Sequence, residues 1–207
     1  MSEPKAVASS VEQVADGVWV WSVPDDRIGG SPSSAAAVES GPGEIVLVNP
    51  VRVAQEELDR LGHVTAIVLT SDHHLRSAPH YREVTGAAIW APAGADLDDD
   101  EADDTFTDGN ELPGGLKVVR LEGPRGGESA FYLKRAGGVL IVGDALINLP
   151  AAAGGLQILP EAHNPDVAGT RKSCRKLLDY DFEIVLFGHG EPIRSGGRAQ
   201  LEKVLRA

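Results

Sequence analysis

The sequence predicts an α+β protein in which two β-sheets pack together and helices lie outside them. Residues 17–51 are a series of strand-like runs, strands then alternate with helices, and a similar order returns after residue 116. Alternating or β-branched runs bounded by Gly and Pro are typical of strands, and apolar residues at helical spacing are typical of helices. The 207 residues contain no linker-like stretch, so we expect one domain spanning residues 1–207.

The elements of the first half are marked by their turns. Residues 17–23 (GVWVWSV) alternate large apolar side chains, and Gly41-Pro42-Gly43 separates residues 33–40 from residues 44–51, which predicts a hairpin. The later elements predicted here are a helix over 52–62, a buried strand over 64–70, a short helix over 78–86 and a strand over 87–92.

The second half repeats strands and then helices. Gly137-Gly138 predicts a hairpin between residues 130–136 and 139–144. Asp166 is a suitable N-cap for a helix over 166–179, whose apolar side includes Cys174 as a core residue. The other elements predicted are strands over 116–123 and 182–190 and a final helix over 198–207.

Charge and composition exclude several classes of function. The net charge of −12 argues against nucleic acid as a partner, because phosphate binding needs clustered Lys and Arg. Much of the negative charge lies in residues 96–108 (DLDDDEADDTFTD), which lack the EF-hand pattern. We expect a solvated surface loop there, because like charges repel and stay hydrated.

Membrane and export signals are missing from the sequence as well. The apolar runs are too short to cross a membrane, and residues 1–10 do not resemble a secretory signal. Cys174 is the only cysteine, which excludes an internal disulfide and a Cys-based zinc site. We therefore expect a cytoplasmic protein.

Three strand ends carry the residues suited to chemistry. Each is an apolar run that stops at Asp or His, and in two of them Gly permits a tight turn there. They are residues 68–78 (VLTSDHHLRSA), 139–146 (VLIVGDAL) and 184–192 (IVLFGHGEP).

Together and in this order, these motifs resemble those of the metallo-β-lactamase superfamily, over residues 14–193. The resemblance implies a four-layer αββα sandwich with metal ligands at the rim of its two sheets. It also implies that Asp144 is the carboxylate that bridges two metals and that His189 is a metal ligand. Residues 121–133 (LEGPRGGESAFYL) correspond to the family's Pro-Gly-His-Thr-x-Gly-Ser, which puts Arg125 in place of a histidine.

The first motif departs from the family's Thr-His-x-His-x-Asp-His. Without a gap, its three His and one Asp fall on Ser71, His73, Leu75 and Arg76. With two residues deleted, its Asp-His falls on the pair formed by His73 and His74. The sequence leaves both registers open, and either one gives an incomplete ligand set.

The surviving ligands predict one metal ion at most. A catalytic zinc takes three protein ligands and one open position. A guanidinium about 4 Å from a divalent ion would be repelled by about 8 kcal/mol at an effective dielectric constant of 20, so Arg76 and Arg125 disfavour a second ion. The candidate metal ligands are His73, His74, Asp144 and His189, with Asp72 and Glu191 as weaker additions.

Two functions remain open. The first is a hydrolase with one zinc per chain that acts on a small ester, lactone, thioester or phosphoester. Asp144, His189 and Arg76 would be its catalytic residues, and Arg76, Arg125 and Asp72 would bind substrate. The second is an inactive family member in which Arg76 pairs with Asp144 in place of the metal, and the Arg- and His-lined cleft binds an anionic metabolite or a protein partner. In either case we expect a monomer or homodimer.

Overall fold

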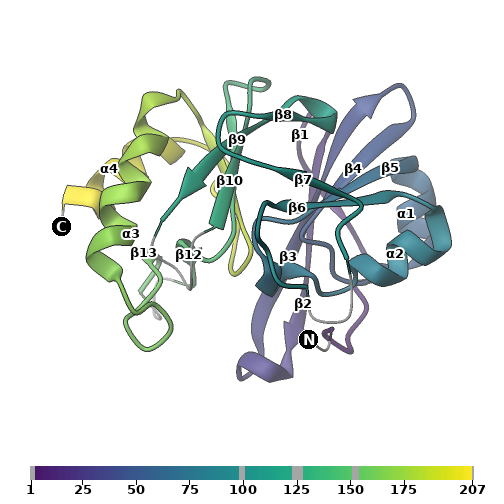
Figure 1. Cartoon of the computed structure of the whole chain (residues 1–207), viewed down its shortest axis with the longest axis horizontal. Coiled ribbons are helices and arrows are strands. Elements are labelled where there is room, and N and C mark those ends of the chain that lie inside the picture. The colour runs from purple at the N-terminus through teal and green to yellow at the C-terminus, as the bar shows by residue number, and fades with distance from the viewer. Residues whose placement is uncertain (1–2, 98–100, 123–127, 151–153, 207) are drawn as a thin grey trace. The chain divides into compact units, whose positions relative to one another are not determined.

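Two units make up the chain in the computed structural model, which describes residues 3–97, 101–122, 128–150 and 154–206. The N-terminal unit comprises Met1–Phe106 with Leu112–Gly115, and the C-terminal unit comprises Thr107–Glu111 with Leu116–Ala207. Figure 1 shows that each unit has helices and strands of its own. The division into two compact units does not test whether they form one domain, so the single domain expected from the chain length stays a prediction.

The N-terminal unit is built on a seven-stranded sheet whose strands follow sequence order from β1 to β7. Neighbours up to β4 pair antiparallel and the later neighbours pair parallel, with α1 and α2 as crossover connections. The strands are β1 (Glu12–Ala15), β2 (Val18–Asp25), β3 (Ser31–Gly41), β4 (Glu44–Val48), β5 (His63–Val68), β6 (Ala88–Pro92) and β7 (Asp104–Phe106). The helices are α1 (Gln55–Leu61) and α2 (Ala78–Thr85), with 3₁₀ turns at Asp26–Ile28 and Asp72–His74.

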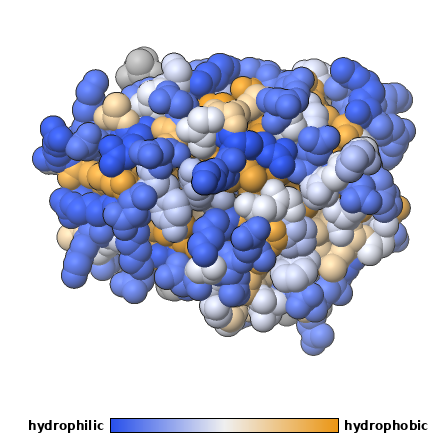
Figure 2. All heavy atoms as spheres, turned by 90° about the horizontal axis from the view of Figure 1, so that it is seen from above, coloured by the Kyte–Doolittle hydropathy of each residue, from blue (hydrophilic) through white to orange (hydrophobic). Residues whose placement is uncertain are grey.

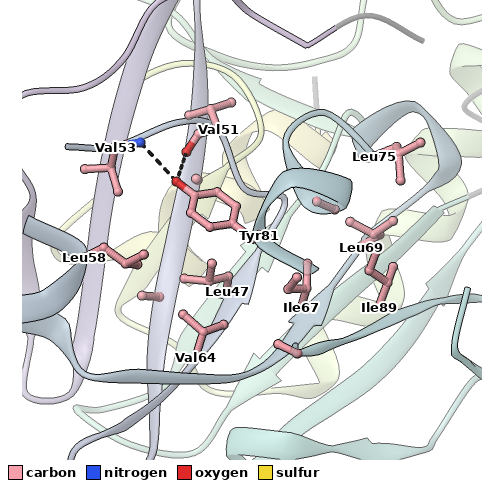
Figure 3. Close-up of a cluster of buried hydrophobic side chains, with 14 of the residues drawn as sticks. Leu47, Val51, Val53, Leu58, Val64, Ile67, Leu69, Leu75, Tyr81 and Ile89 are labelled. Atoms are coloured by element: carbon pink, nitrogen blue, oxygen red, sulfur yellow. Dashed lines mark hydrogen bonds between the residues drawn. The ribbon is translucent and has the colours of Figure 1, made fainter. Parts of the chain in front are cut away.

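The apolar core of this unit fixes α2 against the sheet. Figure 3 shows Tyr81 of α2 beside Leu47 and Ile67, in a cluster that is almost wholly buried. The Tyr81 hydroxyl accepts the Val53 N–H at 3.1 Å and donates to the Val51 carbonyl at 3.2 Å, so its polar tip is satisfied inside the core. Because α2 is anchored in this way, the loop between β5 and α2 starts and ends at fixed positions.

The C-terminal unit contains a five-stranded sheet in the order β14-β11-β10-β9-β8 and a two-stranded sheet of β12 and β13. The pair of β11 and β14 is parallel, so both strands end at the same edge of the sheet. The strands are β8 (Glu111–Leu112), β9 (Leu116–Leu121), β10 (Glu128–Leu133), β11 (Val139–Val142), β12 (Leu146–Asn148), β13 (Leu156–Ile158) and β14 (Ile184–Phe187). The helices are α3 (Val167–Cys174) and α4 (Gly197–Arg206), with a 3₁₀ turn at Arg175–Asp179. The 3₁₀ turn at Pro113–Gly115 belongs to the N-terminal unit.

The predicted elements of this unit are present with shifted ends. The hairpin at Gly137-Gly138 is confirmed, and the Asp166 side chain accepts the Gly169 N–H at 2.7 Å as the N-cap of α3. The predicted helix over 166–179 becomes α3 and then a 3₁₀ turn. Cys174 is fully buried, and burial raises the pKa of its thiol to about 12, which confirms it as a core residue.

The solvated loop predicted for residues 96–108 is wrong in part. Residues 98–100 lie outside the described part of the chain, but Asp104–Phe106 form β7, which pairs parallel with β6. Phe106 is buried while Asp104 stays exposed. Backbone pairing at the edge of a sheet tolerates charged side chains, so the acidic composition concealed a strand.

The surface agrees with the charged composition. On the face seen in Figure 2, hydrophilic residues cover most of the surface and apolar residues lie in groups between them. Among the described helices, none combines the length and apolar character needed to cross a membrane.

Candidate functional site

In the N-terminal unit, the loop after β5 carries a buried histidine held by a chain of side chains. His74 is 1% exposed, and its Nδ1 lies 2.7 Å from the Thr70 hydroxyl. The Asn49 carboxamide holds Thr70 in turn, because its Oδ1 accepts the Thr70 N–H at 2.8 Å and its Nδ2 donates to the hydroxyl at 3.0 Å. The side chains of Asn49 and Thr70 therefore fix the orientation of the His74 imidazole.

This arrangement suits a neutral imidazole that binds a ligand through Nε2. If His74 Nδ1 donates to the Thr70 hydroxyl, that hydroxyl can donate in turn to Asn49 Oδ1, 3.2 Å away. In that tautomer Nε2 carries a lone pair. Metal-binding histidines are commonly oriented in this way by a hydrogen bond to the other ring nitrogen.

The structure distinguishes the two histidines that the sequence left open. The His73 side chain is 29% exposed and its Nδ1 lies 3.6 Å from Asp72 Oδ1, the same oxygen that accepts the His73 N–H at 2.7 Å. His73 and Asp72 thus form a partly exposed local pair, whereas His74 points into the interior. His74 is the better candidate ligand of the two.

Arg76 lies two residues beyond His74 and is buried, with a positive φ of 42°. Its Nη1 donates to the Ser34 carbonyl at 2.8 Å and to the Asn49 carbonyl at 3.2 Å. These bonds tie the loop to β3 and to the residue that follows β4. The predicted pairing of Arg76 with Asp144, which lies in the other unit, stays a prediction. The predicted role of Arg125 falls outside the described residues.

In the C-terminal unit, the parallel strands β11 and β14 bring Asp144 and His189 together. His189 Nε2 lies 3.3 Å from Asp144 Oδ1, and the two side chains are 18% and 17% exposed. Two ligand atoms each about 2.0–2.1 Å from one tetrahedral ion lie roughly 3.3 Å apart, so this pair has the spacing of two zinc ligands.

A tight backbone contact holds the His189 loop in place. Gly190 has a φ of 104°, and a Cβ added to it would lie 2.0 Å from the Asn148 carbonyl oxygen, so only glycine fits. The Glu191 N–H donates to that oxygen at 2.9 Å, and Asn148 Nδ2 donates to the Glu191 carbonyl at 2.8 Å. The weaker candidate Glu191 therefore contributes its backbone to the loop, and the sequence reasoning missed Asn148.

Glu128, a residue that the sequence reasoning also missed, lies behind Asp144. It is 1% exposed, and its Oε2 accepts the Asp144 N–H at 2.6 Å. Burial, and then the charge of Asp144, raises the pKa of Glu128 to about 8, although hydrogen bonds from the amides of Ala145, Asp144 and Gly143 act in the opposite direction. The sequence offered one sign of it, an acidic residue at the start of the strand-like run ESAFYL, which forms β10.

Each unit thus supplies side chains of its own with the chemistry of metal ligands. The N-terminal unit offers the imidazole of His74, and the C-terminal unit offers the carboxylate of Asp144 and the imidazole of His189. Two imidazoles and a carboxylate are a donor set found in catalytic zinc sites.

Comparisons with known proteins agree over nearly the whole length of the chain. A sequence model of the metallo-beta-lactamase superfamily matches residues 17–207. The chain is similar to the crystal structure of DIM-1 metallo-beta-lactamase exposed to ceftazidime, with a TM-score of 0.74 and 14% identity over 98% of this chain and 99% of that one.

Two further solved structures show the same likeness. FIM-1 from Pseudomonas aeruginosa, in a mono-zinc form, gives a TM-score of 0.73 and 14% identity over 98% of this chain and 97% of that one. A metallo-beta-lactamase from Erythrobacter litoralis, with beta-mercaptoethanol in its active site, gives 0.73 and 17% over 95% and 94%. At these identities the likeness concerns the fold. A search of curated proteins finds no match.

Proposed function

The chain belongs to the metallo-β-lactamase superfamily and has its α+β fold, as the sequence predicts, and from this premise we propose that it is a hydrolase with a single metal ion. His74, Asp144 and His189 are the proposed ligands, a possible set of three for one ion. Three protein ligands with one open position is the arrangement of a catalytic zinc.

The observation that carries this proposal is the fixed orientation of the ligand side chains. Asn49 and Thr70 orient His74, and the ligand atoms of Asp144 and His189 have a tetrahedral spacing. Holding a side chain in one orientation costs conformational entropy. Side chains without a binding role are seldom held in this way, so the fixed orientation supports a role as ligands. The solved structure of FIM-1 in a mono-zinc form supports the idea that one ion can occupy this fold.

A bound zinc would supply Lewis-acid polarisation and a nucleophilic water at neutral pH. The residues of the chain would do the rest. Asp144 and His189, whose ligand atoms lie 3.3 Å apart, would hold the ion from the C-terminal unit. Because metal ligands must be deprotonated, metal affinity should depend on pH. Arg76 brings a positive charge to the loop of His74, where it disfavours a second ion and attracts an anionic group of the substrate.

The substrate class that we propose is a small ester, lactone, thioester or phosphoester. These share a polarisable oxygen next to the bond that breaks, and this is the chemistry that a mononuclear centre serves. We further propose a monomer or homodimer in the cytoplasm. We propose neither nucleic acid nor an anionic membrane surface as a partner, because the net charge is −12.

A second candidate function follows from the burial of Arg76. The Arg76 guanidinium is only 5% exposed and donates to the neutral Ser34 and Asn49 carbonyls, so a carboxylate such as Asp144 would balance its buried charge. In this alternative Arg76 takes the place of the metal. The protein then binds an anionic metabolite or a protein partner without catalysis.

Elemental analysis after dialysis, combined with a panel of ester, lactone, thioester and phosphoester substrates, separates the two candidates. We expect close to one zinc per chain, loss of zinc in His74→Ala and Asp144→Asn, and retention in His73→Ala as the matched control. Two tightly held ions would contradict the proposed role of Arg76. Protein that holds no zinc and hydrolyses nothing would support the second candidate.

A further inference from the structure

We propose that Glu128 is a positioning residue that holds Asp144 in place through the backbone of the turn between β11 and β12. The proposal rests on the function proposed above, in which Asp144 is a ligand. It adds a residue to which the motifs read from the sequence gave no role. Glu128 itself has no part in the proposed ligand set.

The turn between β11 and β12 lies against the Glu128 side chain. Gly143, Asp144 and Ala145 connect the end of β11 to the start of β12. The Asp144 N–H donates to Glu128 Oε2 at 2.6 Å, and the neighbouring amides of Gly143 and Ala145 face the same carboxyl group closely enough to lower its pKa. Consecutive backbone N–H groups that converge in this way form a concave anion site, or nest. The carboxyl group that occupies this nest belongs to the chain itself.

The sheet does not need the contact between Glu128 and the turn for its register. Strands β10 and β11 already pair from Phe131 opposite Ile141 to Leu133 opposite Val139. Glu128 lies at the other end of β10, beyond this ladder, and its carboxyl group reaches the turn instead. Its effect should therefore fall on the turn and on the Asp144 side chain that the turn presents.

This placement is costly for the fold. A carboxyl group that is 1% exposed, and whose Oε1 is buried with no hydrogen-bond partner among the described residues, is unfavourable for folding because its removal from water is only partly compensated. A neutral side chain would avoid that penalty. Glu128 costs stability and yet fixes the backbone of Asp144, a proposed ligand. Its presence is therefore better explained by a role in the proposed metal site than by a contribution to stability.

The test compares wild type with Glu128→Ala and Glu128→Gln. Glu183→Ala is the matched control, because Glu183 also accepts a backbone N–H, that of Gly196 at 2.7 Å, in the same unit. Two quantities are measured: the hydrogen exchange of the amides at 143–145 in zinc-free protein, and the zinc dissociation constant by competition with a chromophoric chelator.

We expect Glu128→Ala to speed exchange at 143–145 by at least about tenfold and to weaken zinc binding by about 10–100-fold, the usual effect of removing a group that orients a ligand. Glu183→Ala should change neither. Added formate, which is small enough to occupy the emptied nest, should partly restore both in Glu128→Ala and have no effect on wild type. If Glu128→Ala does not fold, Glu128→Gln keeps the volume and should show smaller shifts in the same directions.

The outcomes separate this inference from the proposed function. Unchanged exchange at 143–145 would overturn the role of Glu128, whatever the zinc affinity. Faster exchange with unaltered zinc affinity would also overturn it, because the turn would then not control the ligand. A wild-type protein that binds no zinc would refute the proposed function, while the exchange measurement would still decide whether Glu128 holds the turn.

Discussion

Two carboxyl groups are equally buried, one in each unit, and their surroundings act on them in opposite directions. Asp25, at the end of β2, accepts hydrogen bonds from Arg27 Nε at 2.8 Å and Nη2 at 2.6 Å and from the Ser33 hydroxyl at 2.7 Å. The hydrogen bond from the Arg27 side chain holds the pKa of Asp25 well below its usual range. Burial and the charge of Asp144 instead raise the pKa of Glu128 to about 8.

The difference shows that the partner, more than burial, determines what a buried charge does. Both residues are 1% exposed. Asp25 has a guanidinium and a hydroxyl, so its ionised form is favoured and stabilises the hairpin of β2 and β3. Glu128 has backbone amides and a neighbouring carboxylate, so its ionised form opposes folding. The first arrangement serves stability, and the second is better suited to the proposed site.

The largest predicted effect is the pH dependence that Glu128 gives to the metal-free protein. Its pKa rises from an ordinary value of 4.5 in the unfolded chain to about 8 in the folded one, so the folded state binds more protons between these values. Its contribution to stability is therefore fully present below about pH 4.5 and is lost as the pH rises through 8. The loss should be on the order of a few kcal/mol.

Denaturant unfolding of EDTA-treated protein between pH 5 and pH 9 measures this loss. Glu128→Gln should flatten the decline, because the amide does not titrate, whereas Glu183→Gln should leave it intact. An equally steep decline in Glu128→Gln would show that Glu128 does not carry the uncompensated charge, and the contrast with Asp25 would disappear.

The second prediction concerns a pairing of Arg76 with Asp144. Such a pair would neutralise Asp144 and so reduce its electrostatic repulsion of Glu128. Arg76→Ala removes the donor of the buried Ser34 and Asn49 carbonyls and should destabilise the metal-free protein by about 3 kcal/mol. A double-mutant cycle with Asp144→Asn gives the coupling energy. We expect it to be below about 0.5 kcal/mol if Asp144 is a metal ligand. A coupling above about 1 kcal/mol would favour the Arg76–Asp144 pair and the second candidate function.

The third prediction concerns Asp25. Asp25→Asn keeps the size of the side chain but removes the charge that Arg27 and Ser33 stabilise, and it should cost about 2 kcal/mol at pH 7. Because the folded pKa is lowered from 3.8, the contribution is present above that value and is lost as the pH falls below it. Unfolding curves of wild type and Asp25→Asn should therefore converge in acid. Asp26→Asn, at the exposed neighbouring residue, is the control and should match wild type at each pH.

The parts of the molecule that the sequence predicted are those with a regular period. The turns at Gly41 and Gly137, the N-cap Asp166 and the strand ends before Asp144 and His189 follow from local patterns, and the structure contains them. These features depend on residues that are close together in the chain. Most of the fold could therefore be derived without knowing how distant segments meet.

The parts that the sequence did not predict depend on distant partners or on a turn without a regular period. The burial of Glu128 comes from a turn that lies sixteen residues later in the chain. The choice between His73 and His74 depends on a single 3₁₀ turn, in which neighbouring residues point about 120° apart, so the period of the preceding strand does not determine it. Asn49, which orients Thr70, lies twenty-one residues before it.

The smallest predicted effect on stability is in the N-terminal unit, where side chains rather than backbone orient the proposed ligand. Thr70→Val keeps the shape of the buried residue but removes the hydroxyl between Asn49 and His74, and it should cost about 1 kcal/mol. Zinc affinity should fall by about 10–100-fold, because the imidazole loses the group that fixes its tautomer. Thr70→Ser retains the hydroxyl and should keep most of the affinity. Equal zinc affinity in Thr70→Val and Thr70→Ser, measured by chelator competition, would show that His74 needs no orienting partner. The two units would then differ, because Glu128 would orient a proposed ligand in the C-terminal unit while Thr70 and Asn49 would not do so in the N-terminal unit.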